Sequence, residues 1–282
     1  MKVLFISDFS LNHTIGGAQR SNDIIIKEGL NRGHEVSLFT YDKEVTEFLS
    51  KDYDIVVSSN LEVISKQKPE VLDYLASIDN HSRLEHDMCY YLTAEKRKRL
   101  YENCNHSFFL TQYHCDKFKE YYGDYFNNVR IVPDPISKDF YDFGKKRDNK
   151  VLYVGFFHPL KGTTAFCQYV MDNPQTNFVV SGWGDSFYTS FFTKQENVEF
   201  FASHNHGMMP VFYNSCDTLY CRPVVDEPFC RSFGEALCCG IKNFITNEKI
   251  GSYHMYEDLD SISLFRQQCY QAHETFWEIL EK

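Results

Sequence analysis

The chain has 282 residues, of which 43% are hydrophobic. This length and hydrophobic content are sufficient for two domains of ordinary size, each with its own core, and they exclude a single small domain. The formal net charge of −10 argues against a nucleic-acid partner and gives no polybasic anchor for anionic lipid, so we expect neither nucleic-acid binding nor stable membrane insertion.

The first residues and the cysteines indicate the compartment. The opening MKVLFISDF has a short apolar run that ends at Asp8, too short for a signal-peptide core or a membrane span. The ten cysteines form no CxxC pair, and several lie inside apolar segments, as buried thiols do in a reducing compartment. We therefore expect a soluble, cytoplasmic protein without disulfides or a zinc site.

Strands and helices alternate along the first half of the chain, the pattern of a parallel sheet covered by helices. The apolar segments predict strands at residues 3–7, 34–41, 53–58, 83–87, 104–111 and 128–133. Helical patterns occupy residues 16–33 and 68–78, and another begins near Gln112. A basic cluster at residues 96–99 is interpreted as the solvated face of a helix; a contact with the acceptor or a membrane is the alternative. These features predict an α/β domain over residues 1–142.

The alternation begins again after a polar segment with two prolines, residues 133–150, which is interpreted as an interdomain linker. Strands are predicted at residues 151–157, 177–185, 197–202, 217–223 and 242–247, and helices at residues 161–173 and 206–216. The pattern predicts a second doubly wound α/β domain over residues 150–260. Residues 261–282 form a terminal helix that Asp260 or Ser261 caps.

Glu227 and Glu235 lie in the run EPFCRSFGEALCCG, with seven residues between them. The run follows an apolar strand and leads into a helix that Gly240 closes. Glu227 is therefore expected in a strand-to-helix loop and Glu235 on the helix, so that both carboxylates face one ligand at the carboxyl ends of the strands. Taken alone, the pair is explained more simply as a helix-start acid and a solvated helical residue.

The surroundings of these glutamates resemble the signature of family 4 of the retaining glycosyltransferases. Glu-Pro-Phe, then Arg231, then Glu-Ala-Leu-x-x-Gly carry the resemblance. It implies the GT-B fold, in which two Rossmann-like domains face a central cleft and the terminal helix often crosses back to the first domain. In that family the first glutamate lies against the donor sugar and the second binds the ribose. The resemblance implies these roles for Glu227 and Glu235, with Arg231 and Ser232 beside the donor.

The segment VLYVGFFHPLKG is similar to the family's opening of the donor domain, which usually runs Val-Gly-Arg and then Lys-Gly. Lys161 matches the phosphate-binding lysine, whose ammonium would neutralise charge on the departing nucleoside diphosphate. Phe156 stands in the place of the usual arginine, and Cys230 in the place of the usual glycine after Phe229. Arg231 is a candidate substitute for the missing cation. A solvated helix-start lysine is the alternative interpretation of Lys161.

Gly16 and Gly17 follow the first strand and open a helix. Paired glycines let the backbone approach a ligand, and a helix amino terminus attracts anions. The pattern is not Gly-x-Gly-x-x-Gly, so Asp42 is not expected to bind the ribose of NAD. In the glycosyltransferase interpretation this loop closes over the donor phosphates; a flexible loop is the alternative. The segment SGWGD, residues 181–185, resembles the Gly-x-Gly loop before the base pocket.

The first domain is expected to supply the acceptor side of the catalytic centre. RLEHDMCYY contains Glu85-His86-Asp87, which resembles the Glu-His-Asp of some small bacterial and phage members of the family. His86 would hydrogen-bond the donor sugar and Asp87 would orient its ring. His81 is the rival histidine.

Residues 52–54 and 258–260 both read Asp-x-Asp, the metal motif of the other large glycosyltransferase fold. The first precedes a strand at the surface and the second caps the terminal helix. We therefore expect no metal, and no cofactor apart from the nucleotide sugar that serves as donor substrate.

The resemblance, together with these features, implies a metal-independent, retaining glycosyltransferase that moves a hexose-type sugar from a UDP- or GDP-linked donor to an acceptor hydroxyl. The expected catalytic residues are His86, Glu227 and Lys161, and the expected donor-binding residues are Gly16, Gly17, Lys161, Arg231, Ser232 and Glu235. The alternatives are a nucleotide-sugar-binding protein that does not transfer and a GT-B sugar-nucleotide epimerase. The acceptor, whether glycan, lipid-linked or protein, stays open.

Overall fold

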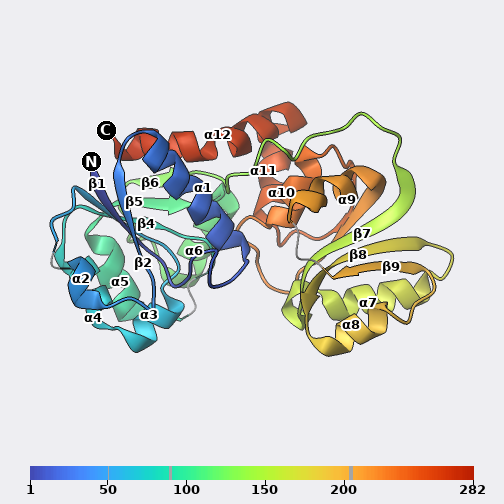
Figure 1. The fold of residues 1–282 in the computed structure, drawn as a ribbon, viewed down its shortest axis with the longest axis horizontal. Helices are drawn as coiled ribbons and strands as arrows, with labels where there is room; N and C mark the ends of the chain where they lie inside the picture. The colour runs from blue at the N-terminus through green and yellow to red at the C-terminus, as the bar shows by residue number, and fades with distance from the viewer. Residues whose placement is uncertain (50, 89–90, 203–205) are drawn as a thin grey trace. The chain divides into compact units, whose positions relative to one another are not determined.

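The computed structural model describes residues 1–49, 51–88, 91–202 and 206–282. The chain divides into two compact units. Unit 1 comprises Met1–Pro135 and Gln268–Lys282, and unit 2 comprises Ile136–Gln267. Each unit contains one sheet whose strands all run parallel (Figure 1). Parallel strands need helical crossovers, which explains the alternation seen in the sequence.

The sheet of unit 1 has six strands in the order β2-β1-β3-β4-β5-β6. The strands are β1 (Lys2–Ile6), β2 (Glu35–Phe39), β3 (Ile55–Ser58), β4 (His81–Leu84), β5 (Cys104–Phe109) and β6 (Val129–Ile131). The helices are α1 (Gly17–Asn31), α2 (Val45–Leu49), α3 (Glu62–Gln67), α4 (Glu70–Ser77), α5 (Ala94–Glu102) and α6 (Gln112–Tyr122). The last turns of α12 (Ile262–Leu280) also belong to this unit.

Helices cover both faces of this sheet. Side chains alternate along each strand, so that Leu4 and Ile6 of β1 join a core that α2 to α6 complete. On the other face, the ring of Phe108 lies 4.6 Å from that of Phe276 on α12. The sheet is thus buried on both sides, as its near-continuous apolar strands predict.

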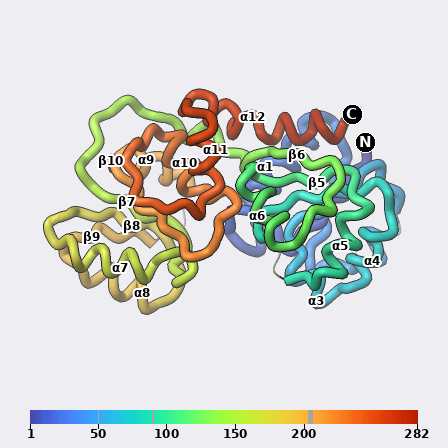
Figure 2. Tube along the Cα trace, turned by 180° about the vertical axis from the view of Figure 1, so that it is seen from behind, coloured from blue at the N-terminus to red at the C-terminus, as the bar shows by residue number. Residues whose placement is uncertain are grey.

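The sheet of unit 2 has five strands in the order β11-β10-β7-β8-β9. Figure 2 traces this unit and labels β7 to β10. The strands are β7 (Asp148–Phe157), β8 (Asn177–Gly184), β9 (Val198–Ala202), β10 (Cys216–Cys221) and β11 (Asn243–Thr246). The helices are η1 (Pro159–Lys161), α7 (Thr163–Asp172), α8 (Ser186–Phe192), η2 (His206–Met208), α9 (Met209–Ser215), α10 (Arg231–Cys238) and α11 (Gly251–Leu259). The core against α7 and α8 is aromatic, with Tyr153 stacked 4.3 Å from Phe166.

The segment interpreted as a linker packs largely on unit 2, which begins at Ile136 rather than near residue 150. Phe140 is buried and its ring lies 5.0 Å from that of His206. The segment after Phe140 is held by Asn214, whose side-chain oxygen accepts a hydrogen bond from the Phe143 amide at 2.8 Å. The segment is polar overall, but its aromatic side chains provide apolar surface that packs on unit 2.

Some local features differ from the sequence-based expectations. Strand β4 begins at His81, two residues earlier than predicted. In the basic cluster, Arg97 is buried rather than solvated, because its guanidinium lies 3.4 Å from the centre of the Tyr122 ring and donates to the Leu92 carbonyl. Within the described part of the chain, no helix combines the length and the apolar character that crossing a membrane requires.

Helix α12 holds to unit 1 through Trp277. This side chain is fully buried, and its indole N–H donates to the Ile25 carbonyl of α1 at 2.7 Å. Gly29 makes room for it, since a Cβ atom there would lie 2.3 Å from the indole ring. Only a residue without a side chain allows this approach.

We expect Trp277→Ala to lower the free energy of unfolding by about 3–5 kcal/mol, because it leaves a large cavity between α1 and α12. Guanidinium denaturation followed by circular dichroism measures this loss. Leu264→Ala removes an exposed side chain from the same helix and should change stability by less than about 0.5 kcal/mol. Equal losses in the two variants would contradict the packing role of Trp277.

Candidate active site

Lys161 and Glu227 form an ion pair at the carboxyl edge of the unit 2 sheet. Lys161 ends η1, which follows β7, and Glu227 lies in the loop between β10 and α10. Lys161 Nζ lies 2.5 Å from Glu227 Oε1. The sequence-based prediction placed each residue after a predicted strand, and the parallel pairing of β7 with β10 brings the two together.

Two backbone contacts fix the spacing of these loops. The Val224 amide donates to the Leu160 carbonyl at 2.9 Å. Gly162 has φ +82°, and a Cβ atom there would lie 2.0 Å from the Arg222 carbonyl oxygen. The glycine of the Lys-Gly pair is therefore required both by its backbone conformation and by the close approach of the second loop.

The ion pair holds Lys161 in its charged form. Burial disfavours the ammonium, but the Glu227 carboxylate outweighs that effect and raises the pKa of Lys161. The lysine side chain is 46% exposed, whereas that of Glu227 is 13% exposed. A ligand can therefore reach a permanently cationic group here.

The backbone of Glu227 is held on both sides. Its amide donates to the Lys249 carbonyl at 2.8 Å, and its carbonyl accepts the Gly251 amide at 2.9 Å. These bonds join the loop to the start of α11, an element that the sequence analysis did not identify. The carboxylate of Glu227 is thus presented from a rigid backbone.

Glu235 lies on α10 in a different environment from Glu227. Its side chain is only 6% exposed. Oε1 lies 3.2 Å from His206 Nε2 and 3.5 Å from Arg231, and Oε2 accepts the Tyr213 hydroxyl at 3.1 Å. Burial favours the neutral acid, but these partners outweigh it and lower the pKa of Glu235. Glu235 is therefore an ionised carboxylate whose two oxygens already have protein partners.

Cys230 stands directly before α10 in a left-handed conformation. Its φ of +67° is the region that favours glycine, the residue that the family resemblance places there. Its Sγ lies 3.3 Å from Cys221 Sγ and 3.4 Å from Ser232 Oγ. Ser232 and Arg231 thus begin the helix beside a pair of thiols that sequence reasoning did not pair.

Two exposed aromatic rings lie at the carboxyl ends of β7 and β8. Phe156 pairs in register with Trp183, and the ring centres are 6.1 Å apart. Phe156 is 44% exposed and Trp183 is 41% exposed. The place where the family has an arginine therefore carries an uncharged, accessible ring.

The glycines of SGWGD have a structural reason. A Cβ atom on Gly182 would lie 2.0 Å from the Gly155 carbonyl oxygen, and one on Gly184 would lie 2.5 Å from that of Phe157. They allow β7 and β8 to pair tightly up to their ends. Asp185 then caps α8 by accepting the Phe187 amide at 2.8 Å.

In unit 1, His86 lies two residues beyond β4 with its side chain 3% exposed. Nε2 lies 2.9 Å from Asn22 Oδ1. Nδ1 lies 3.4 Å from Asp134 Oδ1, an ion-pair distance without hydrogen-bond geometry. Ser21 donates to the same Asp134 oxygen at 2.6 Å. The ring is therefore held between α1 and the residues that follow β6.

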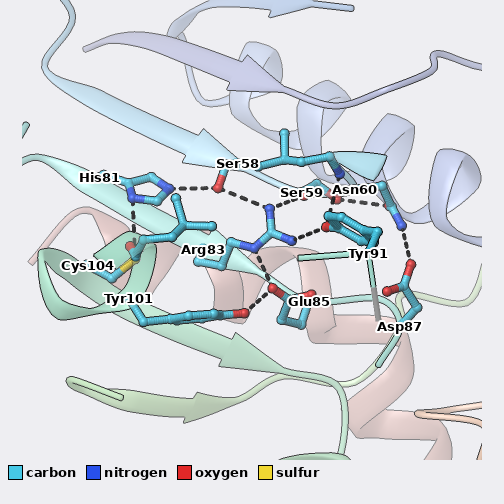
Figure 3. Close-up of polar contacts among 12 residues, drawn as sticks. Ser58, Ser59, Asn60, His81, Arg83, Glu85, Asp87, Tyr91, Tyr101 and Cys104 are labelled. Carbon is cyan, nitrogen blue, oxygen red and sulfur yellow. Dashed lines mark hydrogen bonds and ion pairs between the residues drawn. The ribbon is translucent and has the colours of Figure 1, made fainter. Parts of the chain in front are cut away.

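The acid beside His86 is thus Asp134, whereas the sequence analysis expected Asp87 to orient the ring. The Asp87 carboxylate accepts the Asn60 side-chain amide at 2.8 Å (Figure 3). Asp134 directly follows the predicted strand of residues 128–133, so its place at the carboxyl edge was a usable signal. It was missed because the Pro-Asp-Pro sequence was assigned to the linker.

Glu85 belongs to a buried polar network beneath this edge. Figure 3 shows the Arg83 guanidinium between the Glu85 carboxylate, the Ser59 carbonyl and the Tyr91 hydroxyl. Tyr101 also donates to Glu85. Arg83 and Glu85 are almost fully buried, so each charge depends on the other. The network fixes the backbone that leads into His86.

Gly16 is the N-cap of α1, in an extended conformation with φ −125°. Glycine supplies no side-chain oxygen to the first turn of the helix. A Cβ atom at Gly16 would lie 2.2 Å from Gln19 Oε1. Gly17 is exposed, so the loop is open to a ligand, as the sequence-based interpretation requires.

No family model matches the chain, and no curated protein matches its sequence. Several solved structures match the chain in fold. A sucrose-phosphate synthase from Thermosynechococcus elongatus superposes with a TM-score of 0.69 at 13% identity, over 99% of this chain and 96% of that chain. HepE from Anabaena, solved with UDP and glucose, gives 0.64 at 15% identity, over 99% and 94%. An alpha-glucosyltransferase, solved with UDP and a 13-mer DNA containing an HMU base, gives 0.60 at 12% identity over both whole chains.

The chain has the GT-B fold. Two parallel sheets covered by helices match glycosyltransferase structures over nearly their full length. The predicted fold class is therefore confirmed. At these identities the likeness establishes the fold only, and the residue roles rest on the geometry above.

The two Asp-x-Asp sequences of this GT-B chain have local structural explanations. Asp54 accepts the Lys2 amide at 2.6 Å, and Asp260 is the left-handed C-cap of α11. Ser261, rather than Asp260, caps α12 by accepting the Leu264 amide. Among the described residues, no group of three His, Cys, Asp or Glu side chains is arranged to hold a metal ion.

His81, the rival histidine, is a core residue. It is fully buried, with Nε2 2.7 Å from Ser58 Oγ and Nδ1 3.3 Å from Cys104 Sγ (Figure 3). Burial, together with the nearby Arg83 cation, lowers the pKa of His81 to about 3. The imidazole is therefore neutral in the folded protein and has no access to a ligand.

The pKa of His81 predicts a pH dependence of stability. Its folded pKa lies below the unfolded value of 6.5, so its contribution is complete above that pH and is lost as the pH falls toward 3. At pH 5 the loss is about 2 kcal/mol. Urea denaturation measures the free energy of unfolding at pH 7 and at pH 5. The difference between these two values should be about 2 kcal/mol smaller in His81→Gln than in the wild type. The exposed His158→Gln serves as control, and a wild-type difference in His81→Gln would refute the assignment.

Proposed function

We propose that this chain is a glycosyltransferase that moves a sugar from a UDP- or GDP-linked donor to an acceptor hydroxyl, with retention and without a metal or cofactor. The observation that carries the proposal is the charged, accessible Lys161 paired with the rigidly held Glu227 at a strand edge of a GT-B fold. A diphosphate needs a cation, and a sugar hydroxyl needs an acceptor such as a carboxylate. The HepE structure with UDP and glucose supports this donor class.

In this proposal the donor diphosphate binds to Lys161 and to the first amides of α10, and Glu227 accepts hydrogen bonds from hydroxyls of the donor sugar. Glu235 accepts from the ribose, exchanging its bond from His206 for one from the nucleotide. Arg231 and Ser232 lie beside it on the same helix. The donor-side roles that the family resemblance implies for Gly16, Gly17 and His86 stay predictions.

The proposed transfer step needs no covalent intermediate on the protein. The bond between the anomeric carbon and the phosphate oxygen breaks, and the acceptor oxygen forms its bond on the same face of the sugar. The acceptor proton goes to the departing phosphate oxygen. Lys161 stabilises the negative charge that develops on the diphosphate, which is the largest electrostatic demand of the step.

A nucleotide-sugar-binding protein without transfer is the second candidate. The exposed Phe156 in the place of the arginine favours it, because one cation is then missing from the leaving-group site. The two candidates share the donor site and differ in turnover. Slow release of nucleotide from a bound nucleotide sugar supports the transferase, and binding without release at high protein concentration supports the second candidate.

Calorimetry with a panel of UDP- and GDP-sugars, without added metal, tests the donor site. We expect one donor to bind, and Lys161→Ala to weaken it about 10- to 100-fold because a charge-assisted hydrogen bond is lost. Glu235→Gln keeps the side-chain volume and should weaken binding about tenfold. Lys194→Ala removes an exposed lysine elsewhere in unit 2 and should have no effect. If no nucleotide sugar binds, the proposed function is wrong.

Phe156→Arg tests the missing cation. An arginine at this exposed position should tighten binding of a nucleoside diphosphate by about fivefold at low salt, because it adds a positive charge at the end of β7, the strand that Lys161 follows. The gain should fall as the salt concentration rises. Met171→Arg adds the same charge on an exposed part of α7 and is the matched control. An equal gain in both variants would show that net charge, and not position, is responsible.

A further inference from the structure

Cys221 and Cys230 stand at the two ends of the loop that carries Glu227. Cys221 is the last residue of β10, and Cys230 is the N-cap of α10. Their sulfur atoms are 3.3 Å apart. A disulfide bond is about 2.05 Å long, so a movement of little more than 1 Å would join them.

These thiols differ from the other described cysteines in their exposure. Both are partly exposed, whereas the other described cysteines are buried. The two residues therefore lie nearer to solvent than the cysteines of the cores. The exposure and the sulfur-to-sulfur contact are independent observations, and both indicate an oxidisable site.

The environment also favours a thiolate on one sulfur. The contact with the Cys221 thiol lowers the pKa of Cys230, while the same contact and burial raise that of Cys221. Cys230 also lies at the amino terminus of α10, where an anion is favoured, and its Sγ contacts the Ser232 hydroxyl. Cys230 is therefore the attacking sulfur, and Cys221 is the resolving one.

The backbone at Cys230 adds a further argument. A non-glycine residue at φ +67° is strained, and such strain is concentrated at functional positions. Glycine would relieve the strain but would remove the thiol. A cysteine at this position therefore costs conformational free energy, and folding alone does not require it.

We propose that Cys221 and Cys230 form a reversible disulfide that weakens nucleotide-sugar binding at the adjacent donor site. The effect on binding rests on the proposed function, whereas the disulfide itself does not. Joining the sulfurs pulls the end of β10 toward the start of α10 and distorts the loop between them. That loop holds Glu227 against Lys161, so the ion pair is displaced.

The chemistry balances with a peroxide as oxidant. The Cys230 thiolate attacks one peroxide oxygen, the O–O bond breaks, and a sulfenic acid forms as hydroxide leaves and takes up a proton. The Cys221 sulfur then attacks the sulfenic sulfur, and water leaves. Two thiols thereby lose two electrons and two protons, and hydrogen peroxide becomes two waters.

Mass spectrometry of the full-length protein tests the disulfide. The protein is treated with hydrogen peroxide, free thiols are blocked with N-ethylmaleimide, and the chain is cleaved on the amino side of Asp226, between the two cysteines. We expect peptides joined through Cys221 and Cys230, which dithiothreitol separates. If both cysteines are blocked by the maleimide after oxidation, the proposal is overturned.

Donor binding tests the consequence. Oxidised wild type should bind the donor nucleotide at least tenfold more weakly than reduced protein, and dithiothreitol should restore the affinity. Cys230→Gly and Cys221→Ser should bind normally when reduced and lose no affinity with peroxide, a resistance that a purely structural role would not give. Cys167→Ser, at a buried cysteine, should remain as sensitive as wild type. A joined pair with unchanged affinity overturns the regulatory role.

The two proposals can fail separately. If reduced protein binds no nucleotide sugar, the proposed function is wrong, and the joined peptides alone decide whether the disulfide forms. If reduced protein binds the donor and peroxide has no effect on that binding, the donor site stands and the regulatory role of the disulfide is overturned.

Discussion

Parallel pairing of every strand in the described residues is the constraint on which the rest of the structure depends. It places the carboxyl ends of the strands in each unit along one edge, and the loops that follow them carry the chemistry. In unit 2 this edge brings together Lys161 and Glu227, which are 66 residues apart in the chain. In unit 1 it brings His86 to Asp134 and Asn22. Neither arrangement depends on a local sequence motif alone.

The fold and part of the site could be predicted from the sequence because they depend on periodicity and local pattern. Apolar segments separated by helical patterns are sufficient for two doubly wound sheets. Lys161, followed by a glycine, was predicted at the start of the helix after one strand, and Glu227, followed by a proline, in the loop after another. Their meeting depends on the strand order β10-β7, which the structure gives and the sequence analysis did not predict.

The remaining features depend on contacts that no local pattern encodes. Asp134 reaches His86 across the sheet, and the Cys221–Cys230 contact requires the left-handed turn before α10. The partners of Glu235 come from η2 and α9 as well as from its own helix. Residues 133–150 were interpreted as a linker because the segment is polar and contains two prolines. The buried Phe140 decides where the segment packs.

The two tryptophans of the chain are divided between the units. Trp277 is fully buried in unit 1, and Trp183 is 41% exposed at the strand edge of unit 2. Indole emission depends on the polarity of its surroundings, so we expect the two residues to emit at different wavelengths. A single fluorescence spectrum should therefore contain one signal from the interior of unit 1 and another from the carboxyl edge of the unit 2 sheet, where the candidate site lies. The protein carries its own pair of optical reporters, one for each unit.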